Sequence, residues 1–198
     1  MSVSIDPSSD ALVVVDAQND FTPGGALAVP DGDRVVPVLN RYIERFAAVK
    51  APVFLTRDWH PEVTKHFKAY GGVWPPHCVQ GTKGAEFHPE LRLPPDATIV
   101  SKGMDPEQDA YSAFHAEDSN GMPFAAALGE QGVQRLFLGG LATDYCVRCT
   151  VLDAVREGFR VVVLLDAIGA VDVKPGDGQR ALDEMKAACA SFVTLDEV

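Results

Sequence analysis

A cysteine near the start of a predicted helix is the residue with the clearest chemical potential in this chain. Residues 139–149 read GGLATDYCVRC and lead from an apolar run into a helical pattern, with Thr143 or Asp144 as the N-cap. Cys146 then lies in the first turn, where unpaired N–H groups and the helix dipole favour the thiolate. We therefore predict a nucleophile at Cys146 rather than a small buried hydrophobe. The alternative is a redox CxxC pair with Cys149, which we interpret as a structural thiol.

Charged residues follow three of the other apolar runs. Lys102, Asp16 and Asp166 each come directly after a segment with the composition of a buried strand. Because the carboxyl ends of parallel strands meet at one edge of a sheet, we expect these side chains to converge there with Cys146. A cation lowers the pKa of a nearby thiol, and a carboxylate can accept its proton. Spacing alone does not choose between the two aspartates as the base, and turn carboxylates with a solvated lysine are the alternative.

A long loop between two predicted strands gathers histidines. Residues 57–96, about forty in all, are rich in His, Pro, Gly and aromatic side chains, and structureless loops of that length are usually functional. The loop carries Asp58, His60, His66 and His77. Imidazole and carboxylate ligands suit Zn²⁺, Fe²⁺ or Mn²⁺ better than calcium or magnesium. We therefore predict one divalent transition metal in this loop, with scattered surface histidines as the alternative.

The elements that must position these groups alternate along the chain. Strands are predicted at 11–15, 52–56, 98–101, 135–138, 160–165 and 191–195, and helices at 33–49, from 123, at 143–157 and at 179–190. The strands are continuous apolar runs, which is typical of strands buried on both faces, and the helices are amphipathic. The alternation predicts an α/β fold of three layers, α/β/α, with a mainly parallel sheet.

Composition limits the classes of partner. The chain has 198 residues, 46% of them hydrophobic, which fits a single domain over residues 1–198. The net charge of −11 argues against nucleic acid or an anionic membrane surface and leaves small solutes. With no secretory signal, no apolar run long enough for a bilayer and only four cysteines, we expect a cytoplasmic protein with free thiols. Apolar helix faces leave a homo-oligomer open.

Six short motifs follow one another along the chain: VDAQNDF (15–21), TRDWH (56–60), VWPPHC (73–78), VSKG (100–103), DAYSAF (109–114) and GLATDYC (140–146). In this order they resemble the isochorismatase-like cysteine hydrolase family over nearly the whole chain. The DxH…H…WPPH loop resembles the nicotinamidase (pyrazinamidase) branch of that family. Two details depart from the pattern, since YSAF stands where YSGF is common and Tyr145 precedes the cysteine where other members differ.

The resemblance implies a catalytic triad and a set of metal ligands. The triad falls on Asp16, Lys102 and Cys146, which selects Asp16 over Asp166 as the base. The metal ligands fall on Asp58, His60 and His77, with His66 at a position where the ligand varies in the family.

The resemblance also implies a substrate pocket. The oxyanion hole falls on the N–H groups of Ala142 and Cys146, after a cis peptide bond between Leu141 and Ala142. The aromatic side chains that hold the substrate ring fall on Phe21, Trp74 and Tyr111.

The implied reaction is metal-dependent hydrolysis of nicotinamide, and of pyrazinamide-like analogues, to the acid and ammonia through a cysteine thioester, in NAD salvage. Three other readings are open. A related amide or carbamoyl hydrolase would prefer another substrate. A thiol–disulfide oxidoreductase would depend on Cys149, and a metal-binding module would have no reactive thiol.

Overall fold

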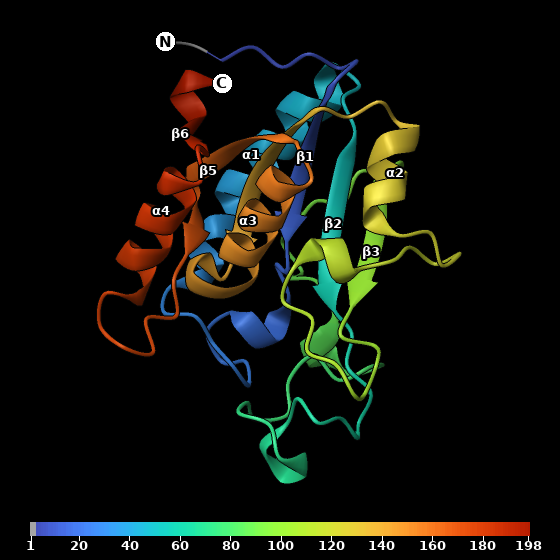
Figure 1. The fold of residues 1–198 in the computed structure, drawn as a ribbon, viewed down its shortest axis with the longest axis vertical. Coiled ribbons are helices and arrows are strands. Elements are labelled where there is room, and N and C mark those ends of the chain that lie inside the picture. Colours follow the sequence, from blue (N-terminus) through green and yellow to red (C-terminus); the bar gives the residue numbers. More distant parts are fainter. Residues whose placement is uncertain (1–2) are drawn as a thin grey trace.

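The central element of the computed structural model, which describes residues 3–198, is a sheet of six parallel strands (Figure 1). The strands lie in the order β3-β2-β1-β4-β5-β6. Their bounds are β1 Asp10–Val15, β2 Val53–Asp58, β3 Thr98–Lys102, β4 Arg135–Leu141, β5 Arg160–Gly169 and β6 Ser191–Val193. All five strand pairings are parallel, which confirms the predicted α/β class.

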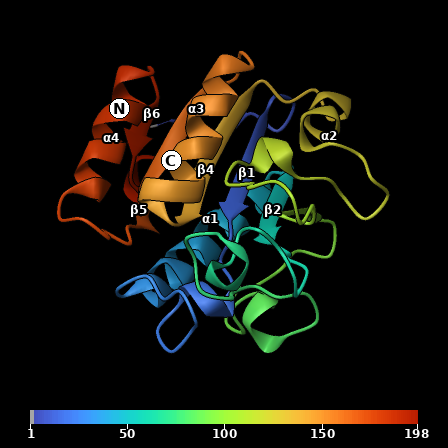
Figure 2. The ribbon, with the colours of Figure 1, turned by 60° about the horizontal axis from the view of Figure 1, so that its bottom comes forward.

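Helices cover both faces of this sheet (Figure 2). The helices are α1 Val35–Ala48, α2 Phe124–Glu130, α3 Arg148–Arg156 and α4 Asp177–Ala187. Side chains of β1 alternate between two hydrophobic clusters: Leu12 and Val14 pack with residues of α1, whereas Val13 and Val15 pack with residues of α2, α3 and α4. A strand that is apolar at every position is therefore buried on both sides, which explains the continuous run in the sequence. The three-layer prediction is confirmed.

Short turns of helix connect the regular elements. The 3-10 turns are Asn19–Phe21, Gly32–Arg34, Lys68–Tyr70, Lys83–Ala85, Ala113–His115 and Leu195–Glu197. The helix predicted at 143–157 divides into a π-helical turn, Thr143–Val147, followed by α3. The residue that precedes this turn is Ala142, and neither Thr143 nor Asp144 caps it with a side chain, so the predicted N-cap is wrong.

Strand β5 is longer than its apolar run. It continues to Gly169, beyond a register shift against β4 between Leu138 and Gly140. Asp166 therefore lies within β5 rather than after it. Its carboxylate accepts hydrogen bonds from the Tyr42 hydroxyl at 2.8 Å and from the Leu195 N–H at 2.8 Å. Asp166 is thus a structural residue. The prediction that it joins Lys102 and Cys146 at the carboxyl ends of the strands is wrong.

The segment between β2 and β3 projects beyond the carboxyl ends of the strands as an irregular lobe (Figure 1). Isolated bridges, such as His60 with Val79 and Phe67 with Trp74, and two 3-10 turns are its regular features. Within residues 3–198, no helix combines the length and the hydropathy that a membrane span requires.

Candidate active site

A buried lysine lies between the predicted base and the predicted nucleophile. The Nζ atom of Lys102 is 2.8 Å from Oδ2 of Asp16 and 3.5 Å from Sγ of Cys146, and it also pairs with Oδ1 of Asp58. Lys102 and Asp16 are fully buried, and Cys146 is 6% exposed. Segments far apart in the sequence thus bring an acid, a cation and a thiol together at the ends of β1, β3 and β4, where the sequence predicted them.

The backbone at the end of β1 aims Asp16 into the site. Asp16 adopts the left-handed conformation, with φ of 46°, so the chain turns sharply away from the sheet after Val15. The Thr56 hydroxyl donates a hydrogen bond of 2.6 Å to Oδ1 of Asp16. Because Oδ1 is occupied in this way, Oδ2 is the oxygen that faces Lys102.

The turn that carries Cys146 requires a glycine. Gly140 has φ of 124°, and a Cβ there would lie 2.0 Å from the carbonyl oxygen of Val15. The peptide bond between Leu141 and Ala142 is cis, as the resemblance implied. The π-helical turn follows, with the N–H groups of Tyr145 and Val147 both donating to the Ala142 carbonyl at 3.1 Å. Ala142 and Cys146 line one pocket, so the arrangement expected for an oxyanion hole is sterically available there.

Burial and the neighbouring charges together shift the pKa values of the three groups. It raises the pKa of the Cys146 thiol well above its usual range; Lys102 opposes this shift and the Asp16 charge adds to it. The same burial raises the pKa of Asp16 against the opposing charge of Lys102. Burial would lower the pKa of Lys102, but Asp16 and Asp58 outweigh it and raise that pKa well above its usual range. The helix start favours the thiolate, whereas burial acts in the opposite direction on the thiol and raises the pKa of the neighbouring Asp16 as well.

Three histidines gather beside the triad. Ring nitrogens of His60, His66 and His77 all lie within 4.8 Å of one another, and all three residues are buried. Oδ2 of Asp58 is 3.5 Å from Nε2 of His60 and 3.8 Å from Nε2 of His77. Asp58 therefore directs one oxygen at the histidines and the other at Lys102. Burial raises the pKa of Asp58, but Lys102 and His60 outweigh it and hold that pKa below its usual range.

The chemistry of these donors fits a transition metal. Each histidine has its Nδ1 engaged: with the Gly103 carbonyl at 3.0 Å for His60, with the Pro75 carbonyl at 2.8 Å for His77, and with Asp109 for His66. Such partners fix the ring and leave Nε2 as the free donor atom. Nε2 of His60 is buried without any hydrogen-bond partner in the described structure. Burial lowers the pKa of His77 to about 4, so its imidazole is neutral at neutral pH, as a metal ligand must be.

A small apolar pocket opens onto Cys146 from this cluster. It is lined by Phe21, Leu27, Asp58, His66, Trp74, His77, Tyr111, Ala142, Tyr145, Cys146 and Val171. All three predicted aromatic residues are present. The indole N–H of Trp74 donates to the Tyr111 hydroxyl at 2.8 Å, and the Tyr145 ring meets Trp74 edge-on at 5.0 Å.

Sequence reasoning missed several residues of this site. Leu27 and Val171 come from loops without a motif, and nothing in the sequence indicates that they reach the pocket. Tyr145 was noted only as a departure, although its place next to the cysteine is a usable signal. Gln18 was also missed. Its side-chain amide accepts a hydrogen bond from the Asp58 N–H and donates one to the Asp58 carbonyl, both at 2.8 Å. Gln18 lies beyond the end of β1, so its side chain holds the backbone of Asp58 in place of a strand pairing.

The cysteines differ in their surroundings. The four are free thiols: Cys78 and Cys146 are buried, Cys149 is partly buried and Cys189 is exposed. Cys149 lies on α3, and burial raises its pKa. Nζ of Lys102, which pairs with Asp16, lies 3.5 Å from Sγ of Cys146, and within residues 3–198 no such buried acid–cation pair contacts Cys149, which agrees with a structural part for Cys149.

The fold and this site define a class of cysteine hydrolase. The isochorismatase domain model matches residues 10–197, and the chain belongs to the isochorismatase family. It is 40% identical to the nicotinamidase of Escherichia coli (strain K12), over 93% of this chain and 94% of that protein. It is also 40% identical to the nicotinamidase/pyrazinamidase of Mycobacterium tuberculosis, over 92% of this chain and 97% of that protein.

A solved structure agrees with the sequence comparison. The structure of the pyrazinamidase of Pyrococcus horikoshii in complex with zinc superposes with a TM-score of 0.87 at 48% identity. It covers 94% of this chain and 99% of that chain. The likeness thus extends over the sheet, the helices and the lobe together.

Proposed function

We propose that this chain is a nicotinamidase, which hydrolyses nicotinamide and pyrazinamide-like carboxamides to the acid and ammonia in NAD salvage. One observation carries the proposal: a buried lysine holds a carboxylate and a thiol together at the mouth of an aromatic pocket. The family membership and the two nicotinamidase relatives support the substrate.

The first half of the reaction forms a thioester. Sγ of Cys146 attacks the carboxamide carbon while its proton passes to Asp16, whose raised pKa makes it an effective base. The N–H groups of Ala142 and Cys146 stabilise the oxyanion. Asp16 then gives the proton to the amine as the C–N bond breaks, and ammonia leaves.

The second half releases the acid. Asp16 takes a proton from water, the hydroxide adds to the thioester carbonyl, and the C–S bond breaks with return of the proton to the sulfur. In both halves, Lys102 supplies the positive charge that offsets the charge of Asp58 and of Asp16 when Asp16 is ionised. Atoms balance, since one water is consumed for each amide cleaved.

Four residues would hold a divalent transition metal: Asp58, His60, His66 and His77. When bound, the ion supplies a Lewis acid that orients a ring nitrogen of the substrate. The zinc in the Pyrococcus horikoshii structure supports zinc as one such ion. Phe21 and Trp74 enclose the ring and exclude water from it, which aligns the carboxamide with Cys146.

Ammonia release from nicotinamide tests the proposal. We expect Cys146→Ala to abolish turnover and to retain nicotinamide binding, because the alanine removes only the nucleophile. Ammonia release by that variant at the wild-type rate would contradict the assigned nucleophile. We further expect chelation to abolish turnover in the wild type and one divalent ion to restore it. An aliphatic carboxamide hydrolysed faster than nicotinamide would favour the related amide hydrolase instead.

A further inference from the structure

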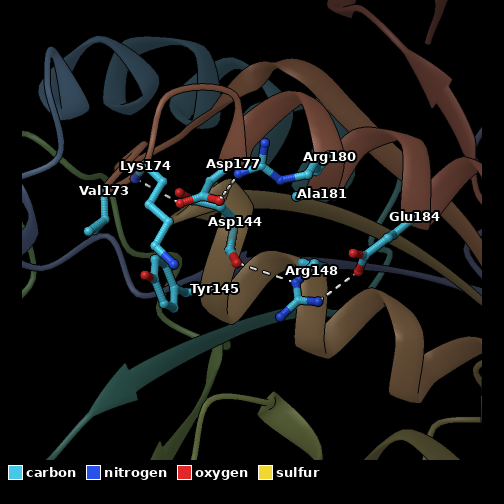
Figure 3. A pocket seen from close by; sticks show the side chains of 9 residues that line it. All are labelled: Asp144, Tyr145, Arg148, Val173, Lys174, Asp177, Arg180, Ala181 and Glu184. Carbon is cyan, nitrogen blue, oxygen red and sulfur yellow. Dashed lines mark hydrogen bonds and ion pairs between the residues drawn. The ribbon is translucent and has the colours of Figure 1, made fainter. Parts of the chain in front are cut away.

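The loop between β5 and α4 forms one wall of the proposed substrate pocket. Val171 in this loop lines the pocket, while Asp172, Val173, Lys174 and Pro175 are exposed. Val173 and Lys174 instead line a separate surface cleft beside Tyr145 (Figure 3). Val171 therefore faces the pocket, whereas the next residues of the loop face an open cleft. Because these residues are exposed, few packing contacts hold the loop in place.

The arginines of that cleft are paired with its carboxylates. Arg148 pairs with Glu184 at 2.7 Å, and Arg180 pairs with Asp177 (Figure 3). The cleft thus presents no unpaired cluster that would call for a ligand. Its interest lies in Asp144, which reaches from the nucleophile turn to the loop.

The carboxylate of Asp144 fastens the loop by two hydrogen bonds. Oδ1 accepts from the N–H of Val171 at 2.9 Å, and Oδ2 accepts from the N–H of Asp172 at 2.8 Å. Asp144 is 6% exposed and stands two residues before Cys146. Beyond this point, Asp172 has a left-handed backbone with φ of 53°, and its own Oδ1 accepts from the Gly178 N–H at 2.8 Å. The pocket wall is thereby tied to the turn that carries the nucleophile.

We propose that Asp144 is a positioning residue that sets the width of the substrate pocket by holding Val171 against it. The inference rests on the proposed function. Asp144 does not itself line the pocket. Its two charge-assisted hydrogen bonds fix the distance between the Val171 wall and the Tyr145 and Cys146 side, and with it the size of ring that fits.

An asparagine at position 144 tests the two hydrogen bonds from Asp144 to the loop, which we call the tether, without a change in side-chain size. Asp144→Asn keeps the shape of the side chain but replaces one acceptor oxygen with an NH₂ group that faces a backbone N–H. One of the two hydrogen bonds, to Val171 or to Asp172, is lost, and the attachment of the Val171 wall is weakened. We expect KM for nicotinamide to rise about tenfold, the effect of losing one hydrogen bond to a charged group, with kcat within about threefold of wild type.

Asp118 provides a control for the loss of charge on a carboxylate that binds loop N–H groups. Its carboxylate also accepts from two loop N–H groups, those of Asn120 at 2.8 Å and Met122 at 2.9 Å, but it lies before α2 and lines no part of the substrate pocket. Both N–H groups donate to Oδ1, so Asp118→Asn keeps these two bonds and removes only the charge of a loop carboxylate, and we expect its KM to match the wild type. Val171→Ala changes the wall directly and leaves the tether intact.

The readout is KM and kcat for nicotinamide and for quinoline-3-carboxamide, which carries a second fused ring. Asp144→Asn and Val171→Ala should both raise the relative kcat/KM for the larger ring, whereas Asp118→Asn should not. An unchanged KM in Asp144→Asn, or an equal rise in Asp118→Asn, would overturn the inference. If Asp144→Asn does not fold, the inference stands or falls on Val171→Ala, and an unchanged ring preference there overturns it. Wild-type protein that releases no ammonia from nicotinamide would refute the proposed function instead.

Discussion

Replacing Lys102 by methionine tests the electrostatic account of the site. Methionine keeps the length of the side chain and removes the charge. Two carboxylates, Asp16 and Asp58, then face one another in a fully buried space without the cation that contacts both. Each would lose its strongest opposite charge, because Lys102 is the main group that lowers the pKa of both acids.

The expected loss is large. Removing one partner from a buried ion pair costs about 3–5 kcal/mol, because the remaining charge is left uncompensated. That is a substantial part of the roughly 5–15 kcal/mol by which ordinary domains are stable. Ammonia release should fall by about 10²–10³-fold or more, the usual effect of removing a group that stabilises developing charge.

Urea unfolding, after a chelator has removed any bound metal, measures the loss in the free energy of unfolding. The control is Lys65→Met, which removes a lysine that is 65% exposed and paired with Glu107, and it should cost less than about 1 kcal/mol. The double variant Lys102→Met/Asp16→Asn should regain part of the loss, since only one buried charge remains. A single variant as stable as Lys65→Met, or a double variant less stable than Lys102→Met, would refute the reasoning.

Three further predictions follow from other contacts. Asp109→Asn should weaken metal binding by about 10–100-fold, measured by competition with a chromogenic chelator, because Asp109 orients the ring of His66; Asp105→Asn, in the same exposed loop, should not. Cys149→Ser should leave ammonia release within about twofold of wild type, and a full loss would revive the redox-pair hypothesis. Above about pH 8.5 the unfolded thiol of Cys146 loses its proton while the native thiol, with its raised pKa, keeps it, so the free energy of unfolding should fall as pH rises. Cys146→Ala should show a shallower fall in urea titrations at pH 8 to 10, and parallel curves would contradict the raised pKa.

The order and kind of the regular elements could be predicted because most strands contain a continuous apolar run and the longer helices α1, α3 and α4 are amphipathic. Their ends could not. The run Arg160–Leu165 stops at Asp166, yet β5 continues through it because pairing with β4 resumes at Ile168, beyond the register shift. A polar side chain indicates that a position is exposed. The end of a strand depends instead on backbone hydrogen bonds with the neighbouring strand, which the sequence does not indicate.

The proposed triad could be located from the residues that follow strands, since the parallel sheet alone brings them to one edge. Its protonation could not. The helix-start argument for Cys146 considers only local dipoles, whereas burial and the two adjacent carboxylates, which raise the pKa of the thiol, act through the tertiary structure. Likewise, Asp144 was expected to cap a helix, and its carboxylate instead crosses to Val171 and Asp172, a contact that depends on how the β5–α4 loop folds back.

Asp58 divides its two oxygens between two centres, with Oδ1 on Lys102 and Oδ2 toward His60 and His77. Any change in how strongly one centre draws electron density from this carboxylate is transmitted to the other across a single carbon atom. Exchanging one ion for another would therefore alter the basicity of Asp16 and the reactivity of the thiol, even for a substrate that never touches the ion. Redesign of the lobe for a different ion would require a compensating adjustment beside Lys102.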